Sequence, residues 1–253
     1  RDWSSDVCSS DLTATPIPRT IALTYYGDLD VVVLDELPKG RQPIETIVAR
    51  TDLERASAED LVRREVASGR QAFVVCAAID EGNRSEVRAA EAEAERLRTE
   101  VFPDLSVALL HGRMRPAEKA AIMERFRAGD EDLLISTTVI EVGVDVPNAT
   151  VMLVENAERF GLAQLHQLRG RIGRGAHRSF CVLFDESKED NEEARARLAA
   201  LARTTDGFAL ADEDLRLRGE GTLFDVRQSG MPDLKLARDR KSTRLNSSHG
   251  YIS

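Results

Sequence analysis

The sequence predicts an α/β protein in which helices cover both faces of a parallel β-sheet. Short runs of consecutive apolar residues recur along the middle of the chain, as expected for strands that are buried on both faces. Segments with helical composition and spacing separate these runs. Hydrophobic residues make up 42% and charged residues 31% of the 253 residues, which is the usage of a folded globular protein.

The expected elements alternate along the chain. We expect buried strands over residues 71–79, 105–110, 133–136, 151–154 and 180–184. One helix is expected over residues 86–100, where Pro103 stops it, and another over 116–128, which begins with a proline and ends before Gly129. Apolar strands separated by helices in this way predict a RecA-like or Rossmann-like layer.

The segments on either side of this layer have a different character. Residues 38–43 hold two prolines and a glycine, which predicts a linker. After the last strand, an Ala-rich helix contains residues 197–201 and a second helix covers residues 209–217. A loop with Gly219, Gly221 and Gly230 follows.

Both ends of the chain look foreign to the rest. Residues 2–11 and 239–249 have no apolar periodicity, and a single DNA oligonucleotide read in opposite senses encodes both segments. This oligonucleotide resembles a common short-read sequencing adapter. We expect residues 1–12 and 239–253 to be translated adapter and the native part to cover residues 13–238; a genuine Ser-rich tail is the alternative.

The overall charge and the cysteine content narrow the function classes. The formal net charge of −9 argues by itself against a nucleic-acid protein, but a phosphate site needs only a local basic cluster. Three cysteines exclude a disulfide scaffold and suit a reducing compartment. No apolar run approaches the roughly 18 to 20 residues that span a bilayer, and no signal peptide is evident. We therefore expect a cytoplasmic protein without a membrane association.

The densest chemical signal is the run QLRGRIGRG over residues 167–175. Its glycines let the backbone approach a polyanion, and its guanidinium groups bind phosphate oxygens bidentately. A solvated basic loop is the alternative. The pattern Q-x-x-G-R-x-G-R resembles motif VI of superfamily 2 helicases. The resemblance implies that Arg171 and Arg174, with Gln167 beside them, reach the γ-phosphate of ATP held by a neighbouring domain.

A second signal is the run STTVIEVGVDVP over residues 136–147, where a strand leads into hydroxyls, a glycine and a carboxylate. Hydroxyls and N–H groups at the end of a strand can bind a nucleic-acid phosphate, and a helix cap followed by a turn is the alternative. The run resembles helicase motif V. This implies a DNA contact at Thr138 and nucleotide contacts at Gly143 and Asp145.

Two weaker signals lie elsewhere. His111 and Gly112 follow an expected strand, as motif IV-type segments do, and the resemblance implies a DNA contact there; a structural histidine is the alternative. The run TATPIPRT over residues 13–20 resembles motif III. In the family, the motif couples ATP hydrolysis to DNA movement, which assigns that role to Thr13 and Thr15.

The last block runs from residue 197 to residue 230. Its arginines, glutamine and glycines resemble the translocation motif that RecG helicases share with transcription-repair coupling factors of the Mfd type, and an ordinary surface loop is the alternative. The matching DNA-translocating residues are Arg197, Arg218 and Gln228. The segments DELPKGR (35–41) and ENAERFG (155–161) resemble RecG more closely. The loop EGTLFD (220–225) departs from the usual RecG pattern.

Half of an ATP site is missing from the sequence. No glycine is followed by lysine, so a Walker A motif is absent. Residues 31–36 (VVVLDE) imitate a Walker B strand but follow the motif III segment, and we interpret them as the strand and linker that enter the second domain. The resemblance places the Walker motifs, and therefore most contacts to ATP and Mg²⁺, on a first RecA-like domain upstream of Thr13. We expect this chain alone to hydrolyse no ATP.

The expected organisation combines these assignments. Residues 13–38 end a first RecA-like domain, residues 39–185 form a RecA-like helicase C-terminal domain, and residues 186–238 form a helical hairpin with the translocation motif. The expected partners are ATP and branched double-stranded DNA, with no obligate protein partner, no metal site within the chain and a bacterial, nucleoid-associated location. A coupling-factor translocase, a passive DNA-binding module and an RNA helicase remain alternatives, although RNA helicases lack the hairpin-loop.

Overall fold

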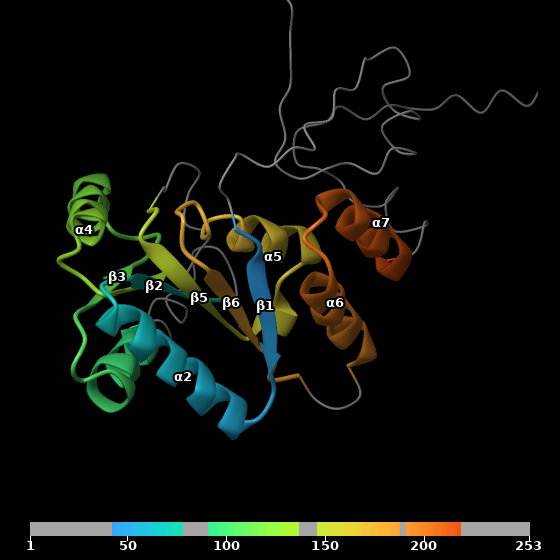
Figure 1. Ribbon diagram of the computed structural model, residues 1–253, viewed down its shortest axis with the longest axis horizontal. Coiled ribbons are helices and arrows are strands. Elements are labelled where there is room, and N and C mark those ends of the chain that lie inside the picture. The colour runs from blue at the N-terminus through green and yellow to red at the C-terminus, as the bar shows by residue number, and fades with distance from the viewer. Residues whose placement is uncertain (1–41, 78–90, 137–145, 188–190, 219–253) are drawn as a thin grey trace, which may run out of the picture.

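The computed structural model describes residues 42–77, 91–136, 146–187 and 191–218. In these ranges, six strands form one parallel sheet in the order β1-β6-β5-β2-β4-β3 (Figure 1). The strands are β1 (Ile44–Ala49), β2 (Gln71–Cys76), β3 (Val107–Leu110), β4 (Leu133–Ser136), β5 (Ala149–Glu155) and β6 (Ser179–Phe184). The helices are α2 (Asp52–Ala67), α4 (Pro116–Ala128), α5 (Leu162–Arg169), α6 (Glu192–Arg203) and α7 (Gly207–Arg218), with a π-helical turn η1 (Leu97–Val101) and a 3-10 turn η2 (Ala157–Arg159).

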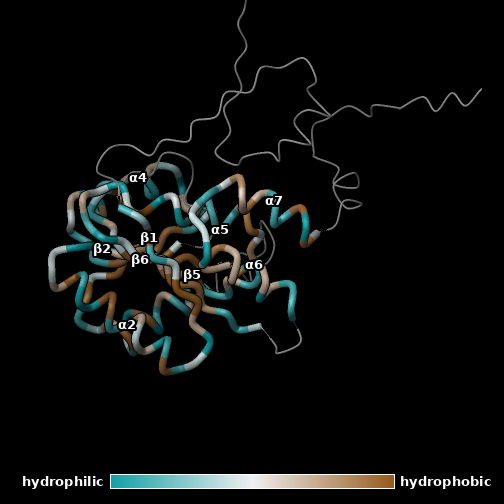
Figure 2. The backbone as a smooth tube through the Cα atoms, turned by 45° about the vertical axis from the view of Figure 1, so that its right-hand side comes forward, coloured by the Kyte–Doolittle hydropathy of each residue, from teal (hydrophilic) through white to brown (hydrophobic). Residues whose placement is uncertain are grey.

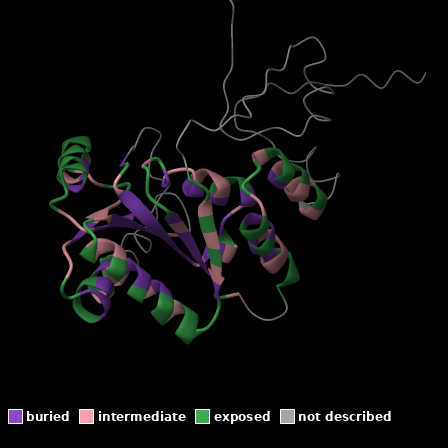
Figure 3. Ribbon diagram, viewed as in Figure 1, coloured by how far each residue is buried: buried purple, intermediate pink, exposed green. Residues whose placement is uncertain are grey.

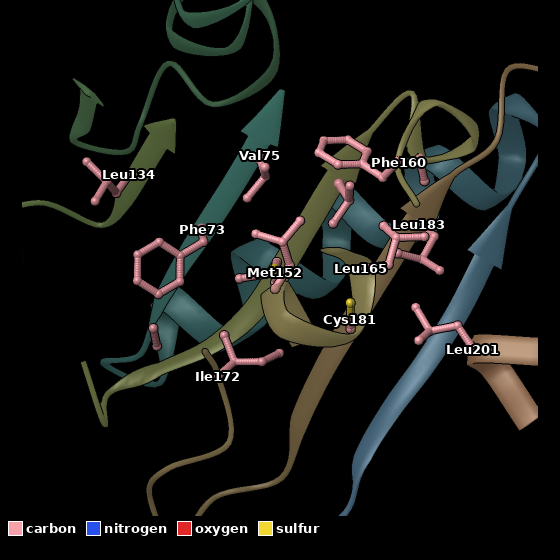
Figure 4. Packing of buried hydrophobic residues seen from close by; sticks show 14 of the residues in the cluster. Phe73, Val75, Leu134, Met152, Phe160, Leu165, Ile172, Cys181, Leu183 and Leu201 are labelled. Atoms are coloured by element: carbon pink, nitrogen blue, oxygen red, sulfur yellow. The ribbon is translucent and has the colours of Figure 1, made fainter. Parts of the chain in front are cut away.

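Helices cover both faces of the sheet because successive side chains on each strand point to opposite sides. On β2, Phe73 and Val75 join a core that also contains apolar residues of α4, α5, α6 and α7 (Figure 4). Their neighbours Ala72 and Val74 join a second core with residues of α2 and η1. The central strands are buried along most of their length, whereas the helices are exposed on their outer sides (Figure 3). The same strands are hydrophobic in their colouring by hydropathy, and the helices carry many hydrophilic residues (Figure 2).

The expected fold class is confirmed, and several elements have the expected bounds. The strand over residues 133–136 and the helix over residues 116–128 are β4 and α4. Gly129, with φ of 87°, ends α4 in the left-handed conformation that glycine adopts at low cost. The strand β3 begins two residues later than expected, because Ser106 donates from its N–H and hydroxyl to the Asp132 carboxylate, at 2.8 and 2.9 Å.

Other expected ranges are met only in part. The strand β2 ends at Cys76, and residues 78 and 79 lie outside the described ranges. The helix expected over residues 86–100 is described from residue 91 onward, and its last turn is η1. Two helices follow the last strand, as expected: α6 contains residues 197–201, and α7 extends beyond residues 209–217 at both ends.

The expected elements leave residues 44–70 unassigned, but the structure has two elements there. The strand β1 and helix α2 occupy this stretch. The strand β1 lies at an edge of the sheet and is largely half-exposed, so its apolar signal is weak. The helix α2 buries Ala58, Leu61 and Val62 but leaves the Leu53 side chain 78% exposed, so its apolar stripe is narrow. A capping box of Thr51 and Glu54 marks its start.

Candidate functional site

The parallel sheet has two edges with different contents. All strands begin at one edge, which we call the amino edge, and end at the other, the carboxyl edge. The segment 170–178, here called the arginine loop, joins α5 to β6 and reaches the amino edge. Residues 146–148 reach the same edge, at the start of β5, whereas His111 and Gly112 follow β3 at the carboxyl edge. The structure therefore separates the expected phosphate contacts Arg171 and Arg174 from the expected DNA contact at His111.

The helix α5 sets where the arginine loop begins. Leu162, Leu165 and Leu168 bury one side of the helix in the core. The Gln164 side chain accepts a hydrogen bond from the Gly161 N–H at 3.0 Å, which caps the first turn. At the other end, the Gly170 N–H donates to the His166 carbonyl at 3.0 Å. The loop thus leaves a helix whose position the core fixes.

Two glycines let the arginine loop pack tightly. Gly173 has φ of +71°, and a Cβ there would lie 2.8 Å from Cγ1 of Ile44. A Cβ on Gly175 would lie 2.6 Å from the Pro147 carbonyl oxygen. The loop therefore rests against the start of β1 and against the end of the motif V segment. Thr138, Gly143 and Asp145 lie outside the described residues, but Pro147, two residues after Asp145, adjoins the arginine loop.

The expected phosphate-binding side chains lie on this loop and on the helix before it. Gln167 and Arg171 are half-buried, and Arg174 is exposed. Partial burial and the positive charge of Arg174 lower the pKa of Arg171, which stays far above neutral pH as in any arginine. Within the described residues, no carboxylate forms an ion pair with Arg171. Among those residues its positive charge is therefore uncompensated, as a phosphate-binding group requires.

Arg169 belongs to the same arginine-rich run but has a different environment. Its side chain is 3% exposed, and Nη1 donates to the carbonyls of Leu201 and Thr204 at 2.7 and 2.9 Å. These carbonyls lie at the C-terminal end of α6, which carries the partial negative charge of the helix dipole. Arg169 therefore joins α5 to the hairpin of α6 and α7. The local pattern does not distinguish it from Arg171, since the difference arises from α6.

The Arg169 guanidinium also fixes the state of a histidine. Its Nη2 lies 3.0 Å from Nδ1 of His166. An arginine has only donors, so Nδ1 accepts and the imidazole is neutral with its hydrogen on Nε2. Burial, and then the positive charge of Arg169, lower the pKa of His166, while Asp206 acts in the opposite direction. The histidine is thus held neutral next to the arginine loop.

The expected DNA contacts at the carboxyl edge lie in a tight turn. The Met114 N–H donates to the His111 carbonyl at 3.2 Å, and Gly112 between them is exposed. A Cβ on Gly112 would meet no atom within 4 Å. Nδ1 of His111 is buried and has no hydrogen-bond partner among the described residues. The turn therefore presents an accessible backbone with one unused polar atom beneath it.

The expected translocation residues are described only in part. Arg197 on α6 is 19% exposed in its side chain, where Nη1 pairs with Glu193 at 2.7 Å and Nη2 donates to the Glu158 carbonyl at 3.0 Å. Arg197 thus joins the hairpin to η2. Arg218 ends α7, but its side chain lies outside the described residues, as do Gln228, Thr13 and Thr15.

An ion-pair cluster at the carboxyl edge has no counterpart in the sequence motifs. Arg55 binds both carboxylate oxygens of Glu155 at 2.9 Å, pairs with Glu186 at 3.0 Å, and lies 3.9 Å from the ring centre of Phe184. Arg50 pairs with Asp185 at 2.8 Å. Burial raises the pKa of Glu155, although Arg55 opposes this. The partners are separated by about a hundred residues or more, so no local pattern could reveal them.

Metal-binding and membrane-spanning features were sought in the described ranges. There, no group of three or more His, Cys, Asp or Glu side chains is arranged to hold a metal ion. None of the helices in those ranges is both long and apolar enough to cross a bilayer.

Comparison with known proteins shows which helicases this chain resembles. Residues 55–176 match the helicase conserved C-terminal domain family. The ATP-dependent DNA helicase RecG of Synechocystis is 54% identical over 226 residues, which are 89% of this chain and 27% of that protein. The chain is thus similar to RecG helicases, and residues 55–176 resemble a helicase C-terminal domain. RecG of Escherichia coli K12 is 52% identical over 227 residues, 89% of this chain and 32% of the relative.

A solved structure agrees with this assignment. The structure of RecG bound to a three-way DNA junction has a TM-score of 0.68 and 47% identity, and the match covers 83% of this chain and 27% of that one. The chain spans about a third or less of the length of the RecG relatives described above. The RecA-like helicase fold is therefore established, and the activity of a whole protein is a matter for proposal.

Proposed function

We propose that this chain is part of an ATP-dependent double-stranded DNA translocase that remodels branched DNA in repair and recombination. The arginine loop carries the proposal, because Arg171 reaches the amino edge without a carboxylate partner in the described residues. Arginines that stabilise charge on a transferring phosphoryl group contribute about 10³- to 10⁵-fold in rate. The similarity to a RecG that was solved on a three-way junction supports branched DNA as the substrate.

The proposed ATP site is shared between two domains. Gln167, Arg171 and Arg174 fit the phosphates, while Gly143 and Asp145 are proposed to contact the nucleotide. As the resemblance to superfamily 2 helicases implies, Mg²⁺ and the Walker groups are proposed to lie on another RecA-like domain of the whole protein. When bound, ATP with Mg²⁺ supplies the phosphoryl group whose transfer the arginines stabilise. The chain alone therefore should hydrolyse no ATP.

The proposed DNA contacts at His111 and Gly112 lie at the carboxyl edge, apart from Arg171 and Arg174. The turn at His111 and Gly112 fits a strand phosphate, since phosphate contacts position a protein on DNA, and Thr138 is proposed to make a further contact of this kind. Arg218 and Gln228 are proposed to contact the duplex, and Arg197 holds the hairpin in place for them. Arg169 joins α5 to α6, so movement of the arginine loop would be transmitted to the hairpin. Thr13 and Thr15 are the proposed coupling residues.

The remaining assignments follow from the same similarity. We propose a cytoplasmic, nucleoid-associated bacterial protein with no obligate protein partner, because the relatives described are bacterial DNA helicases. The division at residues 38, 185 and 238 and the adapter origin of both ends stay predictions. A coupling-factor translocase is not favoured, since the relatives described are RecG helicases. A passive DNA-binding module would bind DNA weakly, with strong salt dependence and no response to nucleotide.

The proposal is tested with Arg171→Ala and Arg174→Ala in the complete protein that contains this chain. We expect the kcat of DNA-stimulated ATP hydrolysis to fall by about 10³-fold for each variant, while DNA binding without nucleotide stays unchanged. The exposed Arg64 on α2 provides a matched control, Arg64→Ala, which should keep full activity. Unimpaired hydrolysis in the two loop variants would contradict the proposal, as would ATP turnover by the 253-residue chain alone.

A further inference from the structure

An arginine outside all of the sequence motifs lies at the junction of the two nucleotide-facing segments. Arg70 is the second residue after the C-cap of α2 and directly precedes β2. Gly69 has φ of +76°, and its N–H donates to the Val66 carbonyl at 2.8 Å. The Arg70 N–H donates to the Glu65 carbonyl at 3.0 Å. These two bonds form a Schellman motif, which fixes the backbone from which the Arg70 side chain departs.

The Arg70 guanidinium bridges two loops. Nη1 donates to Oδ1 of Asn148 at 3.3 Å, and Nη2 lies 3.0 Å from Nδ1 of His177. Asn148 directly follows Pro147 at the end of the motif V segment, and His177 lies near the exit of the arginine loop. The same side chain therefore contacts both segments that face the nucleotide in the proposed function.

Asn148 is held on its other side as well. Its Nδ2 donates to the Gly69 carbonyl at 2.9 Å and to Oε1 of Gln71 at 3.3 Å. The Gln71 N–H in turn donates to the Asn148 carbonyl at 3.1 Å. The amide orientation follows from chemistry, because arginine offers only donors and a carbonyl only accepts. Residues 69–71 thus enclose Asn148 and leave it one arrangement.

We infer that Arg70 is a positioning residue that sets the arginine loop against the motif V segment for ATP hydrolysis. The inference rests on the proposed function. The arginine loop contacts the end of the motif V segment where Gly175 packs against Pro147. Arg70 links the same two segments a second time, through His177 and Asn148. Two contacts fix an orientation that one contact leaves free. Arg171 and Arg174 lie between these contacts and α5, so their placement depends on both.

The bridge requires the shape of arginine as well as its charge. A planar guanidinium directs N–H groups from two nitrogens to two separate acceptors, whereas a lysine ammonium is a compact charge on a flexible stem. In addition, His177 must accept at Nδ1, so its neutral imidazole carries the hydrogen on Nε2. Arg70→Lys therefore removes the bridge and keeps the charge, and Arg70→Gln removes both.

The test compares Arg70→Lys and Arg70→Gln with Arg64→Gln in the complete protein. Arg64 is exposed on the last turn of the same helix. Its replacement by Gln removes one charge at a position away from both loops. We expect kcat for ATP hydrolysis to fall at least about tenfold in both Arg70 variants, because misplacement by about 1 Å can cost 10²-fold. The KM for ATP should change little, and Arg64→Gln should match the parent.

Two structural measurements accompany the kinetics. Hydrogen exchange of the amides in residues 170–178 should accelerate in the Arg70 variants, with α2 and β2 unchanged. In the parent, ¹⁵N chemical shifts of His177 should report the Nε2–H tautomer, and Arg70→Lys should abolish this preference. Unchanged exchange in α2 and β2 also shows that the variants are folded.

The possible outcomes distinguish failure of the proposed function from failure of the positioning role of Arg70. A parent that hydrolyses no ATP overturns the proposed function. An active parent whose Arg70→Lys variant is equally active overturns the positioning role alone. A fall in kcat with unchanged exchange of residues 170–178 also overturns it, because Arg70 would then act by another route. Loss of kcat together with faster loop exchange supports the inference.

Discussion

At the carboxyl edge of the sheet, arginines bind carboxylates, whereas at the amino edge Arg70 binds neutral acceptors. Arg55 is paired with Glu155 and Glu186, and Arg50 is paired with Asp185. By contrast, Arg70 binds an amide oxygen and an imidazole nitrogen. Ion pairs also occur at the amino edge: Arg178 pairs with the exposed Glu45, and Arg125 pairs with Glu131 just before β4. Arg70 therefore differs from Arg50 and Arg55 in keeping a positive charge that no carboxylate among the described residues neutralises.

The difference shows how an acidic chain can offer a site for a polyanion. The positive charge of an arginine in an ion pair is offset by the carboxylate, so the pair attracts a distant anion only weakly. An arginine that binds neutral acceptors has no such offset. Buried Arg169 follows the same rule, since its acceptors are backbone carbonyls and a neutral histidine. The formal net charge of −9 averages over both arrangements and therefore hides the amino edge.

The largest expected effect on stability comes from breaking the Arg55–Glu155 ion pair at the carboxyl edge. In Arg55→Met, Glu155 keeps a buried carboxylate without its bidentate partner, and its side chain is only 9% exposed. We expect the free energy of unfolding of the chain to fall by about 3 kcal/mol in urea titrations. The amino-edge counterpart, Arg171→Met, should change it by no more than about 0.5 kcal/mol.

A double variant provides the control for this prediction. Arg55→Met with Glu155→Gln removes the unpaired charge, so it should be more stable than Arg55→Met alone. If the double variant is as unstable as the single one, the loss comes from packing against Phe184 and not from the charge. If Arg171→Met is equally destabilising, the two edges do not differ as described.

The next effect concerns the contact between the two loops of the amino edge. In Gly175→Ala, the new methyl group would lie 2.6 Å from the Pro147 carbonyl oxygen. Relief requires a backbone shift, so we expect a loss of about 2 kcal/mol in unfolding free energy. Gly112→Ala is the matched control in a loop of the carboxyl edge, where the methyl group meets no atom within 4 Å. Equal stability of the two variants would contradict the close approach at Gly175.

The sequence predicts these regions to different extents. Buried strands and the capped helix α4 have strong local signals, so β4 and α4 are found with their observed bounds. The edge strand β1 and the helix α2 are missed because tertiary packing decides them while their own apolar patterns are weak. The position of the arginine loop follows from its motif, but the roles of Arg169 and Arg70 depend on α6 and on Asn148, which only the fold brings near.

The smallest expected effect is a pair of opposite pH dependences. The pKa of His166 is lowered from 6.5 in the folded chain, mainly by burial, so the unfolded chain binds the proton more readily. Its contribution to stability is therefore complete above about pH 6.5 and is lost as the pH falls toward the native pKa. The pKa of Glu155 is raised by burial, so its contribution decreases as the pH rises above 4.5.

These slopes can be separated by substitution. His166→Gln should remove the loss of unfolding free energy on acidification below pH 6.5, as measured by urea titration at a series of pH values. Asp206→Asn should extend the loss to lower pH, because Asp206 opposes the lowering of the His166 pKa. A His166→Gln chain that retains the full slope would show that protonation beside Arg169 does not destabilise the fold. In that case, a cation facing Arg169 is tolerated, and neutral acceptors are not a requirement of this side of the molecule.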